Sequence, residues 1–365
     1  MIIDKRLFVV ALLVCGCALP GRTARAQRAE IGMDRSNLTR LSEADQEKTL
    51  HNIHALGATW FRDGFSSASP DAIAKFVNEI RLVKQNQLKF LAIVSPTSTD
   101  YDPGYKGINA GEDFRKICGW PGGSPQLSKI NLSNLAQRMR TQLDAVKAAK
   151  LTIDAFEIGN EEDWICYNGD VPNGHQASDA ELLTAVRGYA NFLKTTATVI
   201  HDPHYFPQAK IITFGIAHSS DRWDVPPHHF SNPAHMVAML KNLDGFNYLD
   251  NASYHVDGYG THIYPWDANN LESSMDLVRQ DAAALGPLLS PQKPLWVTEW
   301  GLGAKMYPNK KGESRSDGIK DFYAVMDKTG TPFGATFYYA YDLLVDANGA
   351  LLPEASAVAA AKRVK

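Results

Sequence analysis

Residues 156–163 read FEIGNEED and residues 295–301 read LWVTEWG, and these two stretches indicate the architecture of the whole chain. Each begins with apolar residues typical of a buried strand and then reaches a glutamate. In a parallel barrel the functional groups lie at the C-terminal ends of the strands. The two stretches therefore predict that Glu161 and Glu299, 138 residues apart, meet on one face of a barrel.

The rest of the chain alternates strand-like and helix-like segments without an obvious linker, internal repeat or second domain. The predicted strands cover residues 29–33, 59–62, 89–94, 155–160, 210–216, 257–263, 295–299 and 334–341. The predicted helices cover residues 43–56, 70–85, 132–150, 178–200, 233–243, 271–285, 314–328 and 354–365. Eight such pairs predict a single (β/α)8 barrel over residues 27–365. The competing arrangement is an open doubly wound sheet, which normally has a glycine-rich nucleotide turn that this sequence lacks.

Long connections are predicted at the C-terminal ends of two of these strands. Residues 95–131 and 217–232 are far longer than the usual connection in such folds. Since loops of this kind carry binding and catalytic residues, we expect them to wall a cleft.

Composition excludes some classes of partner. The chain has 365 residues, 44% of them apolar and 21% charged, as in soluble globular proteins. Its net charge is −3, and residues 1–26 carry +3 of their own, which leaves −6 on the remainder. A surface without excess positive charge does not favour a phosphate backbone, so we expect no nucleic-acid partner.

The N-terminus is typical of an export signal. Lys5 and Arg6 precede an apolar run over residues 7–19, and residues 24–26 read ARA. The run is too short for a stop-transfer helix, and no other segment is apolar enough to span a membrane. We therefore expect removal of residues 1–26 and a periplasmic or secreted protein. The alternatives are a bacterial lipoprotein signal, with Cys17 as the acylated residue, and a buried N-terminal helix.

Two cysteines remain after that removal, Cys118 and Cys166. In an oxidising compartment a remaining pair is expected to form a disulfide, and both positions fall in loops on the same face of the predicted barrel. Two unrelated buried thiols are the alternative.

A pair of carboxyl groups on strand ends suits the cleavage of a glycosidic bond. One carboxyl must be protonated to donate to the leaving oxygen, and in the retaining mechanism the other must be ionised to attack the anomeric carbon. A separation of roughly 5–5.5 Å gives retention and a wider one gives inversion. Acidic residues at strand ends also cap helices or form ion pairs, which is the structural alternative for Glu161 and Glu299.

Four neighbouring side chains match this chemistry. Arg62 ends the second predicted strand, where its charge would keep a nucleophilic carboxylate ionised. His262 and Tyr264 are two apart on the sixth strand and so point to the same side. Tyr264 could donate to the nucleophile, and His262 could contact the sugar or tune the acid. Asn160 could bind the substrate 2-hydroxyl.

These motifs together resemble the clan A glycoside hydrolases. The likeness is carried by GNE at 159–161 and VTEWG at 297–301, supported by YGTHIYP at 259–265 and FRD at 61–63. It implies a retaining (β/α)8 enzyme with Glu161 as the acid/base and Glu299 as the nucleophile. The chain lacks the histidine that cellulase-type members have after strand three and the tryptophan that they have after strand eight, so the resemblance assigns no individual family.

Aromatic residues add a second line of argument, because flat rings stack on sugar faces. Trp60 and Trp296 lie within predicted strands and are expected in the core. The tryptophans at strand ends or in the following loops are Trp120, Trp164, Trp223, Trp266 and Trp300. Of these we predict Trp164, Trp266 and Trp300 as substrate contacts, together with Tyr341 at the end of the last predicted strand.

No metal or other cofactor is expected. The histidines at 201, 204, 218, 228 and 229 form no ordered ligand pattern with a carboxylate. No phosphate-binding glycine loop and no serine nucleophile elbow is present.

The sequence therefore predicts an exported, monomeric, retaining glycosidase that acts on a β-linked glycan, within chains rather than at their ends. Action at chain ends is the first alternative. The others are a catalytically silent glycan-binding barrel and a metal-dependent barrel hydrolase.

Overall fold

The computed structural model describes residues 29–65, 69–108, 118, 123–171, 178–217, 233–265 and 267–361. Eight parallel strands form a closed barrel in sequence order, and β8 closes it by pairing with β1. The strands are β1 (Glu30–Asp34), β2 (Trp60–Phe65), β3 (Lys89–Val94), β4 (Ala155–Ile158), β5 (Lys210–Thr213), β6 (Val256–Ile263), β7 (Leu295–Trp300) and β8 (Phe333–Tyr339). The predicted (β/α)8 barrel is confirmed, and the doubly wound alternative is wrong.

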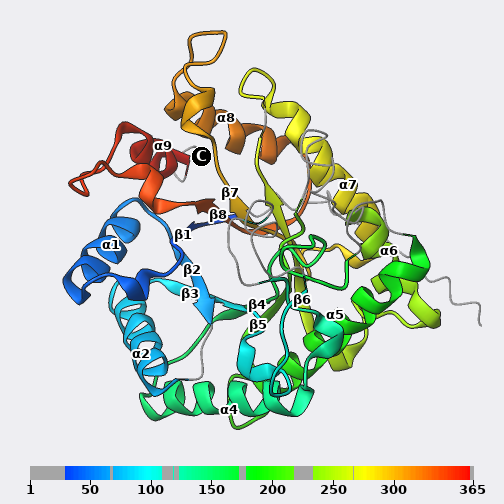
Figure 1. Cartoon of the computed structure of the whole chain (residues 1–365). Helices are drawn as coiled ribbons and strands as arrows, with labels where there is room; N and C mark the ends of the chain where they lie inside the picture. The colour runs from blue at the N-terminus through cyan, green and yellow to red at the C-terminus, as the bar shows by residue number, and fades with distance from the viewer. Residues whose placement is uncertain are drawn as a thin grey trace, which may run out of the picture.

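Helices surround this barrel, as Figure 1 shows. They are α1 (Glu43–Ala55), α2 (Pro70–Gln85), α4 (Leu132–Ala148), α5 (Asp179–Ile200), α6 (Pro233–Asn242), α7 (Met275–Leu285), α8 (Arg315–Lys328) and α9 (Pro353–Ala361), which packs against α8. Several begin at a side-chain cap: Ser42, Ser69 and Ser314 each accept a hydrogen bond from a backbone N–H in the first turn. The predicted bounds are confirmed to within a few residues, except that residues 271–274 form a separate 3₁₀ helix before α7.

Near the N-terminal ends of the strands, the interior of the barrel is filled by large apolar side chains. Trp60 of β2 and Trp296 of β7 meet edge to face with ring centroids 5.2 Å apart, and Phe337 of β8 packs against both. Both tryptophans are in the core, as predicted. Each precedes a polar residue further along its strand, Arg62 or Glu299, so this apolar layer forms the floor beneath the polar end of the barrel.

β5 ends three residues earlier than the sequence suggests, and the chain beyond it passes very close to β6. A Cβ on Gly215 would lie 2.0 Å from Nε2 of His262, so only glycine allows this approach. The β5–β6 register shifts between Ile211 and Ile212, and a single bridge joins Ile216 to Thr261. The close approach sets the position of the His262 ring.

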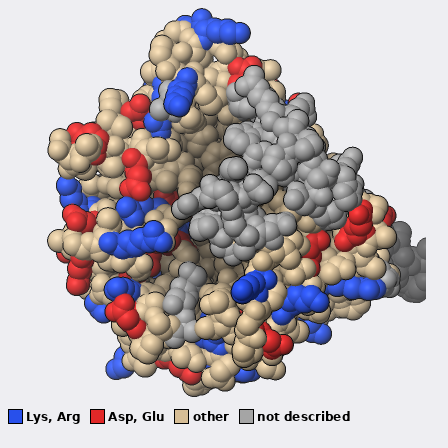
Figure 2. Space-filling view, in the orientation of Figure 1, with Lys and Arg blue, Asp and Glu red and all other residues tan. Residues whose placement is uncertain are grey.

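None of the helices in the described ranges is long and apolar enough to cross a membrane. Residues 1–26, with Cys15 and Cys17, lie outside these ranges, so the predicted signal stays a prediction. Figure 2 shows acidic and basic side chains interspersed on the face that Figure 1 presents, with neither sign dominating it.

Candidate active site

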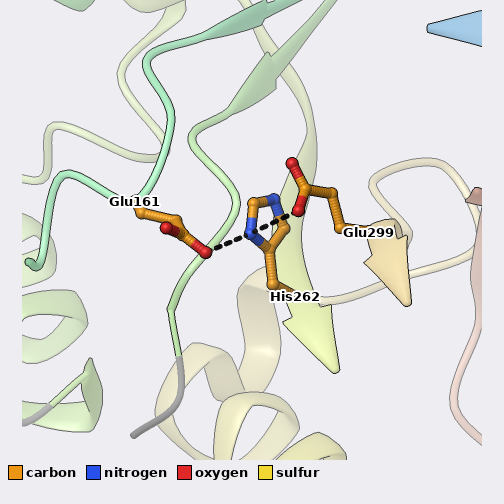
Figure 3. Close-up of side chains that lie close together, drawn as sticks. All are labelled: Glu161, His262 and Glu299. Carbon is orange, nitrogen blue, oxygen red and sulfur yellow. Dashed lines mark hydrogen bonds and ion pairs between the residues drawn. The ribbon is translucent and has the colours of Figure 1, made fainter. Parts of the chain in front are cut away.

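The ends of β4, β6 and β7 bring Glu161, His262 and Glu299 together (Figure 3). One carboxylate oxygen of each glutamate and one ring nitrogen of His262 all lie within 4.8 Å of one another. The glutamate side chains are 14% and 12% exposed, so each is mostly enclosed yet reachable. The two residues singled out in the sequence therefore share one site.

His262 lies between the two carboxylates. Its Nδ1 is 2.7 Å from Oε1 of Glu161 and 3.6 Å from Oε2 of Glu299. Burial favours the neutral ring, but the two nearby carboxylates outweigh burial and raise the pKa of His262 to about 9. The Nδ1–H of the ring donates to Glu161.

Arg62 connects the site to the barrel interior. Its guanidinium donates to Oε1 of Glu299 (2.7 Å), to Oδ1 of Asn160 (3.0 Å) and to Oε2 of Glu157 (2.7 Å), and it also bonds Asp34. Arg62, Glu157 and Asp34 are completely buried. A charged group there needs such partners, because an unpaired charge in the interior is very costly.

The sequence reasoning missed Asp34 and Glu157. Both have a signal in the sequence: each is an acidic residue on a predicted strand or next to its end, and Glu157 is four residues before Glu161. An acidic residue on a buried strand needs a cationic partner, and Arg62 is the one that this barrel supplies.

Tyr264, just after β6, donates its hydroxyl to Oε2 of Glu299 at 2.5 Å. It is 40% exposed, so it is open to solvent beside the buried pair of Arg62 and His262. Tyr339, at the end of β8, packs edge to face against Tyr264 with ring centroids 6.3 Å apart. Tyr339 was not among the predicted contacts.

The two glutamates have opposite electrostatic environments. Burial raises the pKa of Glu161 above its ordinary value, and the hydrogen bond from His262 offsets this only in part. Burial also acts on Glu299, but there the charges of His262 and Arg62 and the bond from Tyr264 outweigh it and lower the pKa. Such a pair supplies one carboxylic acid and one carboxylate at the same pH.

The structure corrects two of the predicted substrate contacts. Trp300 is fully buried and stacks on Phe322 of α8 with centroids 4.1 Å apart, because consecutive strand residues point to opposite sides and Glu299 takes the inner side. Tyr341 is 4% exposed, and its hydroxyl accepts a hydrogen bond from Asn52 of α1. Neither side chain is available to a sugar.

Of the other two predicted tryptophan contacts, the structure describes Trp164 but not Trp266. Trp164 is partly buried and packs against Tyr167 at 5.7 Å, beside the loop cysteines. Trp266 lies outside the described residues, as do Trp120 and Trp223. Trp164 is thus the one predicted tryptophan contact that the described part of the chain leaves open.

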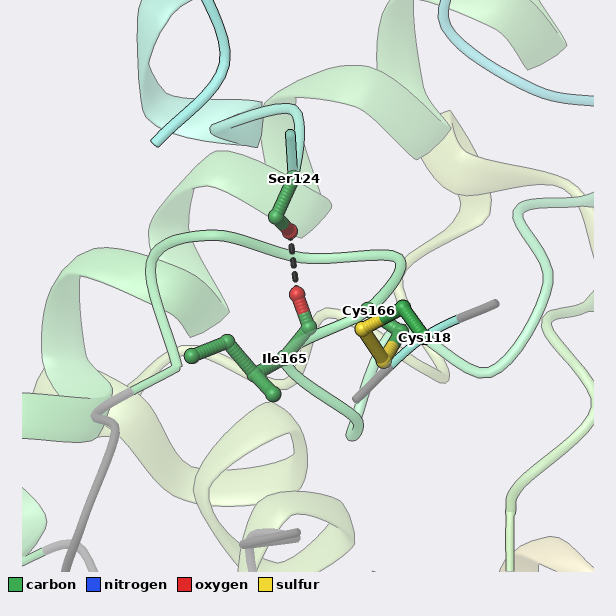
Figure 4. Close-up of a disulfide and its surroundings, with 4 residues drawn as sticks. All are labelled: Cys118, Ser124, Ile165 and Cys166. Carbon is green, nitrogen blue, oxygen red and sulfur yellow. Dashed lines mark hydrogen bonds between the residues drawn. A yellow bond between two sulfur atoms is a disulfide. The ribbon is translucent and has the colours of Figure 1, made fainter. Parts of the chain in front are cut away.

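Cys118 and Cys166 form the predicted disulfide (Figure 4). It joins the loop after β3 to the loop after β4, and the Ser124 hydroxyl donates to the carbonyl of Ile165 between the same two loops. Since Glu161 begins the second loop, these links brace the wall of the site.

Within the described ranges, Glu161, His262 and Glu299 are the one group whose spacing could hold a metal ion. Both oxygens of Glu299 already accept hydrogen bonds, from Arg62 and Tyr264, and Nδ1 of His262 is bonded to Glu161. An ion at this position would have to displace these bonds and sit beside the Arg62 cation.

No protein-family model matches the sequence, and no curated protein matches it. Solved structures do match the fold. A GH5_18 enzyme from Streptomyces cattleya in complex with GlcNAc superposes with a TM-score of 0.57 at 14% identity, over 92% of this chain and 80% of that one. The fungal β-1,4-galactanases match at 0.57 and 15%, over 91% and 99%. The endo-β-1,4-mannanase from Thermotoga petrophila matches at 0.56 and 11%, over 92% and 76%. At such low identity these matches show a shared fold.

Proposed function

We propose that this chain is a retaining glycoside hydrolase of the clan A type that cleaves β-linked glycans. The observation that carries the proposal is the pair of carboxyl groups from β4 and β7, with oxygens within 4.8 Å and pKa values shifted in opposite directions. Several solved structures that share the fold are named as enzymes acting on such glycans, including a mannanase and a galactanase.

The mechanism is double displacement. Glu299, held ionised, attacks the anomeric carbon while Glu161, held protonated, donates its proton to the departing oxygen. Glu161 then takes a proton from water, which hydrolyses the glycosyl ester on Glu299. The close approach of the two carboxyls supports retention, since inversion needs room for a water between them.

The supporting residues act on these two groups. Arg62 and Tyr264 each donate to one oxygen of Glu299, which favours its ionised form and fixes its direction. Because Arg62 holds Oδ1 of Asn160, the amide NH₂ of Asn160 is turned to donate to a sugar hydroxyl. His262 orients Glu161 through its Nδ1–H.

Replacement of each glutamate by alanine tests this assignment. Glu299→Ala should lose at least about 10⁴-fold in turnover, because no covalent intermediate can form, and azide should restore product with the opposite anomeric configuration. Glu161→Ala is the matched variant, in which azide should give a glycosyl azide that keeps the substrate's configuration. Full turnover by Glu299→Ala, or the same azide product from both variants, would contradict the roles.

We infer that the enzyme cleaves within glycan chains, because long loops follow the strands and an exposed tyrosine borders the catalytic pair. β-1,4-linked mannan and galactan are the first substrates to assay, since solved structures of the same fold are named for them. A spread of oligosaccharides early in digestion indicates internal cleavage. Release of a single small sugar from the outset indicates action at chain ends.

Simple assays distinguish the proposed glycosidase from two alternative functions. A silent glycan-binding barrel would retard migration in a glycan gel without releasing reducing sugar. A metal-dependent hydrolase would lose activity on chelation, whereas the mechanism above would not.

We also propose export with removal of residues 1–26, which the disulfide supports because such bonds persist in oxidising compartments. The intact mass of the exported protein tests this: a mature chain that begins at Gln27 supports cleavage, and added lipid on Cys17 supports the lipoprotein alternative.

A further inference from the structure

The short turn after β4 has an unusual backbone. Gly159 has φ +90° and Glu161 has φ +53°, both in the left-handed region. Glycine adopts this region freely, but a residue with a side chain does so only where its surroundings enforce it. Something must therefore hold Glu161 in this conformation.

Glu162 provides the contact that covers this turn from behind. Its side chain folds back so closely that a Cβ on Gly159 would lie 2.7 Å from Cγ and 2.8 Å from Oε1 of Glu162. Oε1 accepts the backbone N–H of Asn160 at 3.2 Å, and the Glu162 carbonyl accepts from Asn168 at 3.0 Å. The Glu161 N–H is bound in turn by the carbonyl of Gly215 at 3.1 Å.

Among the residues that the structure describes, no cation forms an ion pair with the Glu162 carboxyl. It is 1% exposed, and its Oε2 has no hydrogen-bond partner among the described residues. Burial raises its pKa well above the ordinary value, and Asp163, Asp170 and Glu161 raise it further. The charge of Glu162 in turn contributes to the raised pKa values of Tyr101 and Tyr189. Oε1 of the Glu162 carboxyl thus serves the turn as a hydrogen-bond acceptor and not as a partner in an ion pair.

We propose that Glu162 is a positioning residue for the acid/base: its side chain caps the turn at residues 159–161 and sets the direction in which Glu161 enters the site. This rests on the function proposed above. Glu162 does not touch the substrate, and it acts only through the backbone of Asn160 and Glu161.

If Glu162 positions the acid/base, its replacement should slow only the catalytic steps in which Glu161 donates or accepts a proton. Glu162→Met keeps the bulk and removes the acceptor. Its turnover of substrates with poor leaving groups should fall by about 100-fold, as expected for a misplacement near 1 Å. Glycosides of 2,4-dinitrophenol leave without a proton, so kcat/KM for these should change little. Azide should accelerate breakdown of the glycosyl ester in this variant, because azide needs no general base.

Two further variants complete the test. Glu162→Gln retains an acceptor on an uncharged group and should restore wild-type turnover. Glu79→Gln is the matched control, because Glu79 is a second buried glutamate with a strongly raised pKa, on α2. It should leave both leaving-group classes unaffected. If Glu162→Met does not fold, Glu162→Ala and Glu162→Asp, whose carboxyl is too short to reach Asn160, are assayed in the same way.

The outcomes separate this inference from the proposed function. A wild-type protein without glycosidase activity overturns the function. An active wild type with equal losses for both leaving-group classes in Glu162→Met, or with no loss, overturns the positioning role alone.

Discussion

Both oxygens of Glu299 accept hydrogen bonds, Oε1 from Arg62 and Oε2 from Tyr264, whereas among the described residues Glu161 accepts a side-chain hydrogen bond from His262 alone. Hydrogen bonds to a carboxylate favour its charged form, and burial disfavours it. The number and charge of the donors therefore shift the pKa values of two identical side chains in opposite directions.

Tyr264→Phe tests this balance. Loss of the phenolic donor should raise the pKa of Glu299, because the tyrosine hydrogen bond lowers it in the intact site. Glu299 must be ionised to attack, so the acidic limb of the kcat/KM profile should move to higher pH, with a fall of about 10-fold in kcat for one hydrogen bond to a charged group.

The basic limb, set by Glu161, should stay where it is. Tyr341→Phe is the control, since it removes another tyrosine hydroxyl that bonds Asn52 away from the site. An acidic limb that is unmoved, or moved to lower pH, would contradict the role of Tyr264.

At the scale of elements, the loops after β3 and β4 act as one unit. Asp170 accepts from the backbone N–H and the hydroxyl of Ser128, at 2.7 and 2.6 Å, and the Gly169 N–H donates to the carbonyl of Pro125 at 2.7 Å. The Cys118–Cys166 disulfide adds a covalent link across 48 residues of sequence. Glu161 lies at the start of the second loop, so the unit supports its position.

Replacing both cysteines by serine should lower the free energy of unfolding by roughly 2–4 kcal/mol, because the unfolded chain regains the entropy that the crosslink removes. Urea denaturation of the two proteins measures the difference. A reducing agent should bring the wild type to the stability of the double variant and leave that variant unchanged. Equal stability of the two oxidised proteins would show that the crosslink adds nothing.

Over the whole molecule, several buried carboxyls have pKa values raised above their ordinary range. Burial and the nearby Glu299 charge raise the pKa of Asp34 to about 8 despite its bond to Arg62, and burial also raises the pKa of Asp63 and Glu79. Each of these groups binds a proton more tightly when folded than when unfolded. Proton binding is therefore linked to the stability of the fold.

We expect the free energy of unfolding to fall as pH rises from about 5 to about 9. Stability from a carboxyl with a raised pKa is fully present below its unfolded value, near 4, and is lost as pH rises through the folded value. His262, with a pKa of about 9, acts in the same direction above its unfolded value, near 6.5. The lowered pKa of Glu299 also contributes stability, but this contribution is already complete at about pH 5 and so does not change across the window.

Thermal unfolding across this pH range measures the effect. Asp34→Asn removes one of the titrating groups and should lose less stability between pH 5 and 9 than the wild type does. A melting temperature that rises with pH in this window would contradict the linkage.

Much of this architecture could be predicted from the sequence because its signals are local. Apolar runs at strand length, Ser caps and amphipathic spacing each depend on residues within one segment, so all eight strands and the helices were placed to within a few residues. Because the C-terminal ends of all the strands lie on one face of such a barrel, the sequence also predicted that Glu161 and Glu299 lie close together. The same reasoning predicted the disulfide between the two loop cysteines.

The partners of Arg62 and the pKa shifts of the two glutamates were decided by the tertiary structure alone, because they depend on contacts between residues of distant strands. Asp34 and Glu157 meet Arg62 only when the barrel closes, and the opposite pKa shifts of the glutamates arise only from that enclosed set of charges. Trp300 shows the limit of local reasoning: it is next to Glu299 in the sequence, yet the period of the strand turns its ring outward onto α8.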